Sequence, residues 1–160
     1  MFERKVNAFR QSHPIFASIE NASAEIMPNG TPSWEWINIK GNKMEQQDWD
    51  YQENRFLSYI LNGENKDGER FDDDFLVMTS GNPDGSMEVT LPRPPHSGNW
   101  QLVFDTSKPA SYQETKRYTQ GKIYTLSPHS LAVFTAKRED EEKNKELSNL
   151  ILGLKFHKNR

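Results

Sequence analysis

The chain has 160 residues, a formal net charge of -3 and a pI near 5.8, and it contains no cysteine. This length allows one domain with one sizeable core, and the lack of a basic stripe argues against nucleic acid or an anionic membrane as a partner. No apolar run approaches the roughly 18 residues that cross a bilayer, and no signal segment follows Met1. We therefore expect a soluble, cytoplasmic protein without disulfides, thiolate metal sites or a cysteine nucleophile.

The amino-terminal segment has the pattern of an amphipathic helix over residues 2–11. Its apolar residues recur at i, i+4 and i+7 between charged ones, and they are Phe2, Val6 and Phe9. The helix should end before His13-Pro14, because the residue before a proline disfavours the α conformation and proline has no amide to donate. Residues 15–26 fit neither a helical nor a strand period, so we interpret them as a connector.

From Trp34 onward the sequence favours short strands separated by turns. The predicted strands are Trp34 to Ile39, Phe56 to Leu61, Phe75 to Thr79, Met87 to Leu91, Trp100 to Thr106, Ile123 to Leu126 and Leu131 to Thr135. One helical turn is expected near Asp48-Trp49. The continuous apolar run from Phe75 predicts a strand that is covered on both faces. Together these runs predict an all-β antiparallel sandwich of about seven strands, with peripheral N- and C-terminal helices.

Two turn sequences and one alternating strand make the prediction more specific. Asn82-Pro83-Asp84-Gly85 predicts a tight antiparallel connection between the strands on either side of it. Residues 127–129, Ser-Pro-His, predict the turn of a last hairpin. Strict alternation would place Trp100, Leu102 and Phe104 on one face of their strand.

The carboxy-terminal residues 138–160 predict a second amphipathic helix. Acidic residues begin this tail and basic residues end it, which matches the helix macrodipole. Its apolar stripe consists of Leu147, Leu150, Ile151 and Leu154. The stripe should be buried against the sandwich, another copy of the chain or a missing partner. The predicted organisation is thus a helix and linker over 1–31, a β-sandwich domain over 32–137 and the tail over 138–160.

Candidate catalytic and metal-binding residues are few. Asp72, Asp73 and Asp74 lie in a polar run, where nothing would desolvate a general acid, so we interpret them as part of an exposed loop. An EF-hand over the same loop would need a carboxylate at Gly63. The histidines His13, His96, His129 and His157 lack ligand spacing. The sequence therefore predicts no catalytic residue, no metal site and no cofactor.

The four tryptophans are the remaining candidates for binding. Trp36 and Trp100 lie inside strand patterns and are assigned to the core. Trp34 and Trp49 lie at strand margins, where an aromatic face either anchors a core or domain interface or stacks on a sugar ring. These two are the candidate carbohydrate-binding residues.

The order of residues between Pro32 and Phe134 resembles the C-terminal domain of bacterial glycogen debranching enzymes and isoamylases. These are α-amylase-type glycoside hydrolases that cleave α-1,6 branch points. The residues that carry the resemblance are Trp36-Ile37, Gly41, Met44, Asp48-Trp49, Arg55, Leu61-Asn62-Gly63, Asp74-Phe75-Leu76, Val89-Thr90-Leu91-Pro92, Trp100 to Asp105 and Ser130 to Val133. Phe9-Arg10, His13-Pro14 and Phe16 resemble the last helix of that family's catalytic barrel.

The resemblance implies an accessory domain without its catalytic domain. In that family the catalytic carboxylates lie on the barrel, ahead of the part that this chain resembles, so no catalytic residue is carried over. The implied partner is a debranching-enzyme barrel, in cis or in trans, and the chain alone would not be an enzyme. The alternatives are a free-standing carbohydrate-binding module for α-glucan and an enzyme with an unrecognised site, for which the sequence offers no constellation of residues. Self-association through the terminal helices is a further expectation.

Overall fold

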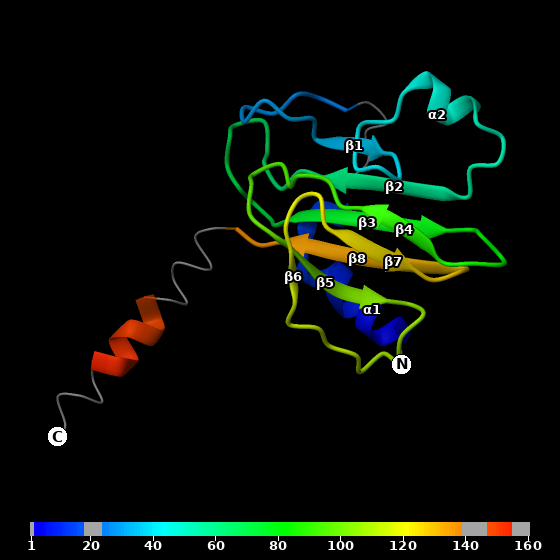
Figure 1. Ribbon diagram of the computed structural model, residues 1–160. Coiled ribbons are helices and arrows are strands. Elements are labelled where there is room, and N and C mark those ends of the chain that lie inside the picture. The colour runs from blue at the N-terminus through cyan, green and yellow to red at the C-terminus, as the bar shows by residue number, and fades with distance from the viewer. Residues whose placement is uncertain (1, 18–23, 139–146, 155–160) are drawn as a thin grey trace.

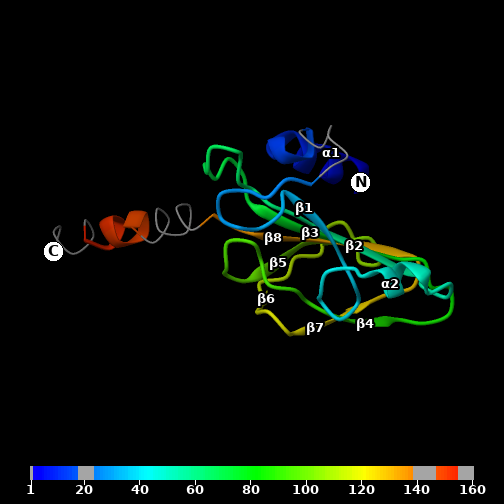
Figure 2. The same cartoon turned by 90° about the horizontal axis from the view of Figure 1, so that it is seen from above.

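The structure is a computed structural model that describes residues 2–17, 24–138 and 147–154. A six-stranded sheet forms the middle layer, with helix α1 on one face and strands β4 and β7 on the other (Figure 2). The elements are α1 (Phe2–Ser12), a 3-10 helix (Pro14–Ala17), β1 (Trp34–Ile37), α2 (Gln46–Asp50), β2 (Phe56–Leu61), β3 (Asp74–Ser80), β4 (Met87–Thr90), β5 (Trp100–Asp105), β6 (Arg117–Tyr118), β7 (Ile123–Leu126) and β8 (Ser130–Ala136). The predicted all-β sandwich with peripheral helices is confirmed.

The strand order in the large sheet is β1-β2-β3-β8-β5-β6, and every neighbouring pair is antiparallel (Figure 1). The second sheet contains only β4 and β7. The described residues form eight strands rather than about seven. The sequence did not predict β6, because its two residues are too short to show a period.

Strand β3 is covered on both faces, as its continuous apolar run predicted. Leu76 and Met78 lie in the core between the sheets, whereas Phe75 and Val77 lie in a second cluster beneath α1. The exposed fraction of these side chains is at most 5%. Because each face of β3 packs in an apolar cluster, its residues are apolar throughout and do not alternate with polar ones.

Both predicted hairpins are wrong, because the chain changes sheet at each of these turns. The segment at 82–85 joins β3 to β4, and the turn at 127–129 joins β7 to β8. Yet β3 pairs with β2 and β8, while β4 and β7 pair with each other. Turn residues specify a reversal of direction, but they do not determine which strands form hydrogen bonds after the reversal. His129 does occupy a turn conformation, with a φ of 47°.

Phe104 does not share a face with Trp100 and Leu102. The register of β5 against β8 shifts between Leu102 and Phe104, so one extra residue of β5 lies opposite the bond between Phe134 and Val133. Such a bulge reverses the side-chain alternation beyond it. Phe104 consequently joins the cluster beneath α1, where most of its surface is buried.

Helix α1 packs its apolar stripe, which is partly buried, against the large sheet, and this is one of the alternatives that the sequence left open. The Phe9 ring meets Phe75 edge-to-face with centroids 5.4 Å apart, and it meets Phe104 in the same way at 6.0 Å. Lys5 Nζ donates to the carbonyl of Ala110 over 3.0 Å. The helix ends at Ser12, before the proline, as predicted. The 3-10 helix that follows adds Ile15 to the same cluster.

The carboxy-terminal stripe, unlike that of α1, does not pack against the sheets. Residues 147–154 are helical, as predicted, and each of them is exposed (Figure 1). The exposed apolar side chains of this segment are Leu147, Leu150, Ile151, Leu152 and Leu154. The rest of the predicted tail helix, at 139–146 and 155–160, lies outside the described residues. Burial of this stripe by a second copy or another partner stays a prediction.

We expect Phe104→Ala to lower the free energy of unfolding by about 3 to 5 kcal/mol, because it leaves a cavity beneath α1. Ile123, in β7, is 54% exposed, so Ile123→Ala should cost no more than about 1 kcal/mol. Chemical denaturation of the two variants measures both values. Equal losses would contradict the burial of Phe104.

A chain that ends at Arg138 should unfold with the same free energy as the full chain, to within about 0.5 kcal/mol. The reason is that residues 147–154 are exposed, whereas the Arg138 amide, which bonds Asp73, is kept. Sedimentation of both chains over one concentration range tests self-association. Association of the full chain alone would support self-association through the tail, and two monomers would contradict self-association.

Candidate functional site

Three consecutive carboxylates at the start of β3 are buried, so the prediction that they form an exposed loop is wrong. The exposed fractions of Asp72, Asp73 and Asp74 are 4%, 6% and 0%. Their polar neighbours in the sequence suggested solvation, but their bonding partners lie far away along the chain. His13 is 59 residues away from Asp72 in the chain, so the residues around Asp72 give no sign of this partner.

Each of these carboxylates holds a different segment. Asp72 accepts the amide of Ile15 over 3.1 Å and contacts His13 Nδ1 at 2.7 Å, which fastens the end of α1. Asp73 accepts the amide of Arg138 over 3.1 Å, where the chain leaves β8. Asp74 accepts the amide of Gly63 over 2.8 Å, and it also accepts the amide of His96 and contacts that ring at 3.0 Å.

These contacts indicate a structural role for the three aspartates. A general acid or nucleophile needs access to substrate, and these oxygens face backbone amides inside the protein. His13, Asp72 and Asp73 offer ligand atoms within 4.8 Å of one another. However, His13 and Asp72 stand in direct contact at 2.7 Å, whereas two ligands of one tetrahedral zinc ion lie about 3.3 Å apart. The geometry is that of a hydrogen bond.

Two buried tyrosines also bond to carboxylates. Tyr124 donates its hydroxyl to Asp105, and Tyr118 donates to Glu114. Burial raises the pKa of both phenols well above its ordinary value, and the bonds to the carboxylates raise it further. Both hydroxyls therefore remain protonated donors at neutral pH. They hold the long loop after β5 and the core between the sheets together, and they are not poised for proton transfer.

The removal of one aspartate tests the structural role. We expect Asp72→Ala to lower the free energy of unfolding by about 1 to 3 kcal/mol, because the buried amide of Ile15 loses its acceptor. The exposed Asp67→Ala is the matched control and should have a much smaller effect. Hydrogen exchange should also show faster exchange in residues 2–17 of Asp72→Ala alone. Unchanged stability would contradict the role of Asp72.

Four aromatic side chains form a strip beside α1, on the same face of the large sheet. Trp36 lies at its centre and meets Trp34, Trp49 and Tyr59 edge-to-face, with ring centroids 5.8, 5.8 and 5.6 Å apart. Trp36 and Tyr59 face each other across β1 and β2. Trp34 and Tyr59 also pack against the cluster beneath α1. We call these four residues the aromatic strip.

The structure separates the tryptophans into two groups. Trp100 is fully buried and donates Nε1–H to the carbonyl of Pro92 over 2.8 Å, which confirms its assignment to the core. Trp36 was also assigned to the core, but it is only half-buried and belongs to the aromatic strip. The alternation along the strand predicted that Trp36 shares a face with Trp34. It could not predict how much of that face α1 covers.

The candidate carbohydrate-binding residues, Trp34 and Trp49, both belong to the aromatic strip. Trp34 is half-buried, and its Nε1–H lies buried without a partner among the described residues. Trp49 has an exposed fraction of 48%. Their edge-to-face contacts with Trp36 mean that the rings do not form one flat platform, which favours packing against another apolar surface. Sugar stacking by these two residues stays a prediction.

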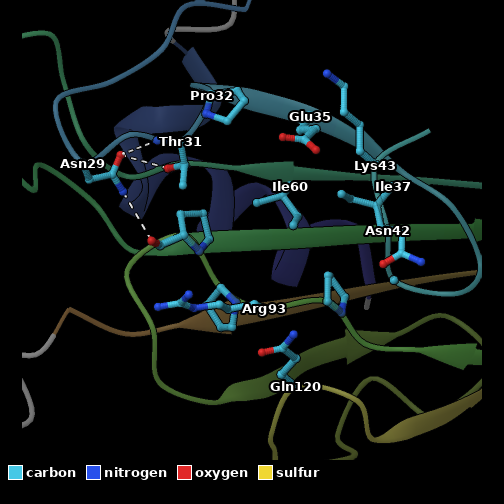
Figure 3. Close-up of a pocket in the computed structure, with 14 residues that line it drawn as sticks. Asn29, Thr31, Pro32, Glu35, Ile37, Asn42, Lys43, Ile60, Arg93 and Gln120 are labelled. Atoms are coloured by element: carbon cyan, nitrogen blue, oxygen red, sulfur yellow. Dashed lines mark hydrogen bonds between the residues drawn. The ribbon is translucent and has the colours of Figure 1, made fainter. Parts of the chain in front are cut away.

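A polar groove of about 390 Å³ lies at the opposite face of β1 (Figure 3). Its lining comes from β1, β2, the turn at 41–43, the loop at 29–32, residues 92–95 and Gln120. Glu35 and Lys43 lie on one side, and Arg93 and Gln120 lie on the other, with Ile37 and Ile60 between them (Figure 3). The sequence analysis did not identify this groove, although the proline-rich residues 92–95 are its most visible signal.

Hydrogen bonds between distant segments hold the walls of the groove. The side-chain amide of Asn62 donates from Nδ2 to Thr31 Oγ1 over 2.9 Å and to the carbonyl of Pro32 over 3.2 Å. Asn29 bonds across to the carbonyl of Pro95 at 3.3 Å (Figure 3). The turn that contains Gly41 lies so close to the end of β4 that a Cβ at Gly41 would stand 2.8 Å from the carbonyl oxygen of Thr90. The walls are therefore fixed without any ligand.

The comparison with known families gave a match over most of the strand region. A family model described as "Isoamylase, C-terminal" matches residues 33–134, which is more than half of the chain. No match was found among curated proteins. The matched range contains β1 to β7, all but the last two residues of β8, the aromatic strip and the groove apart from its loop at 29–32, but not α1 or the tail. Within the described residues, no helix has the length and hydropathy to cross a membrane.

Proposed function

Because the chain belongs to the family of isoamylase C-terminal domains, we propose that it is a non-catalytic accessory domain that packs against the catalytic barrel of a glycogen-debranching enzyme. Its role in glycogen metabolism would be to stabilise that barrel. The observation that carries the proposal is the aromatic strip, a set of packed rings beside α1 that no described residue covers completely.

The position of α1 supports this face as the docking surface. The helix resembles the last helix of the family's barrel, and it lies on the same face as the aromatic strip. A barrel that meets the sheet beside α1 would therefore cover the strip. Leu57 and Trp49 expose 40% and 48% of their surface there. Large apolar side chains that are exposed on one face are typical of a surface that binds another protein domain.

The buried carboxylates support the non-catalytic part of the proposal. A retaining glycosidase needs two accessible carboxyl groups about 5 Å apart. The three adjacent aspartates of this chain instead bond backbone amides in the interior. The proposed enzyme therefore takes its acid and nucleophile from the barrel, and the present chain supplies a docking surface.

A mixing experiment tests the proposal. Branched glucan is incubated with this chain, with the separate barrel domain of an isoamylase-type enzyme, and with both, and the released linear chains are measured. We expect no release by this chain alone, and greater activity or solubility of the barrel in the mixture. Reducing ends produced by the chain alone would overturn the non-catalytic role. A barrel that gains nothing from mixing would overturn the stabilising role.

The docking surface has its own test in the same mixture. Trp49→Ala removes an exposed ring from the aromatic strip, and Ile123→Ala removes an equally exposed apolar side chain on the far layer. Buried tryptophans at an interface often contribute 2 kcal/mol or more, so Trp49→Ala should weaken binding to the barrel by about tenfold or more. Ile123→Ala should bind as the unchanged chain does. Equal binding by all three chains would exclude the strip as the docking surface.

A further inference from the structure

We propose that the polar groove beside β1 binds an oligosaccharide, so that the accessory domain holds glucan as well as a barrel. The inference is drawn from the side chains and walls of the groove. The choice of an α-glucan as the oligosaccharide rests on the proposed function.

Five of the polar side chains that line the groove make no side-chain bond to another described residue. Glu35, Asn42, Lys43, Arg93 and Gln120 have no side-chain hydrogen bond or ion pair with any described residue, although all five line one groove. Carboxylate, amide and guanidinium groups are planar and present two neighbouring donor or acceptor atoms. Pairs of adjacent hydroxyl groups on a sugar ring match that spacing, since each hydroxyl both donates and accepts.

The floor of the groove is apolar, which suits the C–H face of a sugar ring. Ile37 and Ile60 lie at the edge of the core, and the wall at 92–95 contributes the rings of three prolines. These groups are apolar and lack side-chain donors, so they can cover the C–H face of a pyranose without leaving a polar atom unpaired. The combination of an apolar floor and free planar polar groups at the rim favours a polyhydroxylated ligand.

The rigidity of the walls favours binding further. The loop at 29–32 is tied to Asn62 and to Pro95, and the proline wall is tied to Trp100 through the carbonyl of Pro92. A ligand would therefore order only the five free side chains and not the backbone. A preorganised site loses less conformational entropy on binding, which matters for a ligand that gains little from each hydroxyl.

The groove is less suited to two other ligands. An anion would meet Glu35 as well as Lys43 and Arg93, which leaves an excess of one positive charge. A peptide could add to β1 only through the free edge of that strand. This edge is occupied where the amide of Met44 donates to the carbonyl of Trp36 over 3.0 Å.

The groove and the aromatic strip lie on opposite faces of β1. Glu35 and Ile37 line the groove, whereas Trp34 and Trp36 belong to the strip, as the alternation along a strand requires. A barrel that covers the strip would consequently leave the groove open. Glucan binding and domain docking should then be independent properties of this chain.

Affinity electrophoresis of the full chain in gels that contain glycogen tests the proposal, with maltoheptaose titration as the quantitative assay. We expect the unchanged chain to be retarded, and the double variant Arg93→Ala/Gln120→Ala to bind about tenfold more weakly, since it loses several hydrogen bonds. The matched control is Arg4→Ala/Gln113→Ala, which removes the same two residue types outside the groove and should bind normally. Thermal unfolding confirms that all chains are folded.

Three results would overturn the proposal. The first is an unchanged chain that glycogen does not retard. The second is a loss of binding in Trp49→Ala with normal binding in Arg93→Ala/Gln120→Ala, which would assign the sugar to the aromatic strip. The third is displacement by inorganic phosphate but not by maltoheptaose, which would show an anion site. The assay contains no barrel, so its failure would leave the result of the mixing experiment unaffected.

Discussion

The burial of three consecutive aspartates at the start of β3 is the constraint on which the arrangement of the chain depends. Asp72, Asp73 and Asp74 bond the end of α1, the exit of β8 and the loop that contains His96. Buried carboxylates are costly unless they are hydrogen-bonded, so each bond also fixes where its donor must lie. One short segment thereby positions both the amino-terminal helix and the point where the carboxy-terminal tail departs.

The large sheet packs against other elements on both of its faces. One face packs on β4 and β7, and the other carries α1 together with the aromatic strip. The bulge in β5 contributes to this division, because it moves Phe104 from the inner core to the cluster beneath α1. Helix α1 thereby becomes part of the domain, and the aromatic strip lies beside it, partly buried and exposed mainly at Trp49.

The proposed functions follow from the same division. The aromatic strip offers rings that are already packed edge-to-face on a rigid sheet, which suits another protein surface. The groove offers free polar groups over an apolar floor, which suits a sugar. Because the two surfaces alternate along β1, a single four-residue strand would serve both. An accessory domain of this kind would keep glucan near a barrel without contributing to the chemistry.

The sequence by itself determined the fold class, most strand positions, the end of α1 and the resemblance to an isoamylase-type domain. These features are local: they depend on residue type, spacing and the conformational limits of proline. Only the tertiary structure decided that the turns at 82–85 and 127–129 cross between sheets, that Phe104 faces α1, that the three aspartates are buried and that a groove lies beside β1. Each of these depends on residues that are distant in the chain and meet only when strands pair and layers pack, so no local pattern could report them.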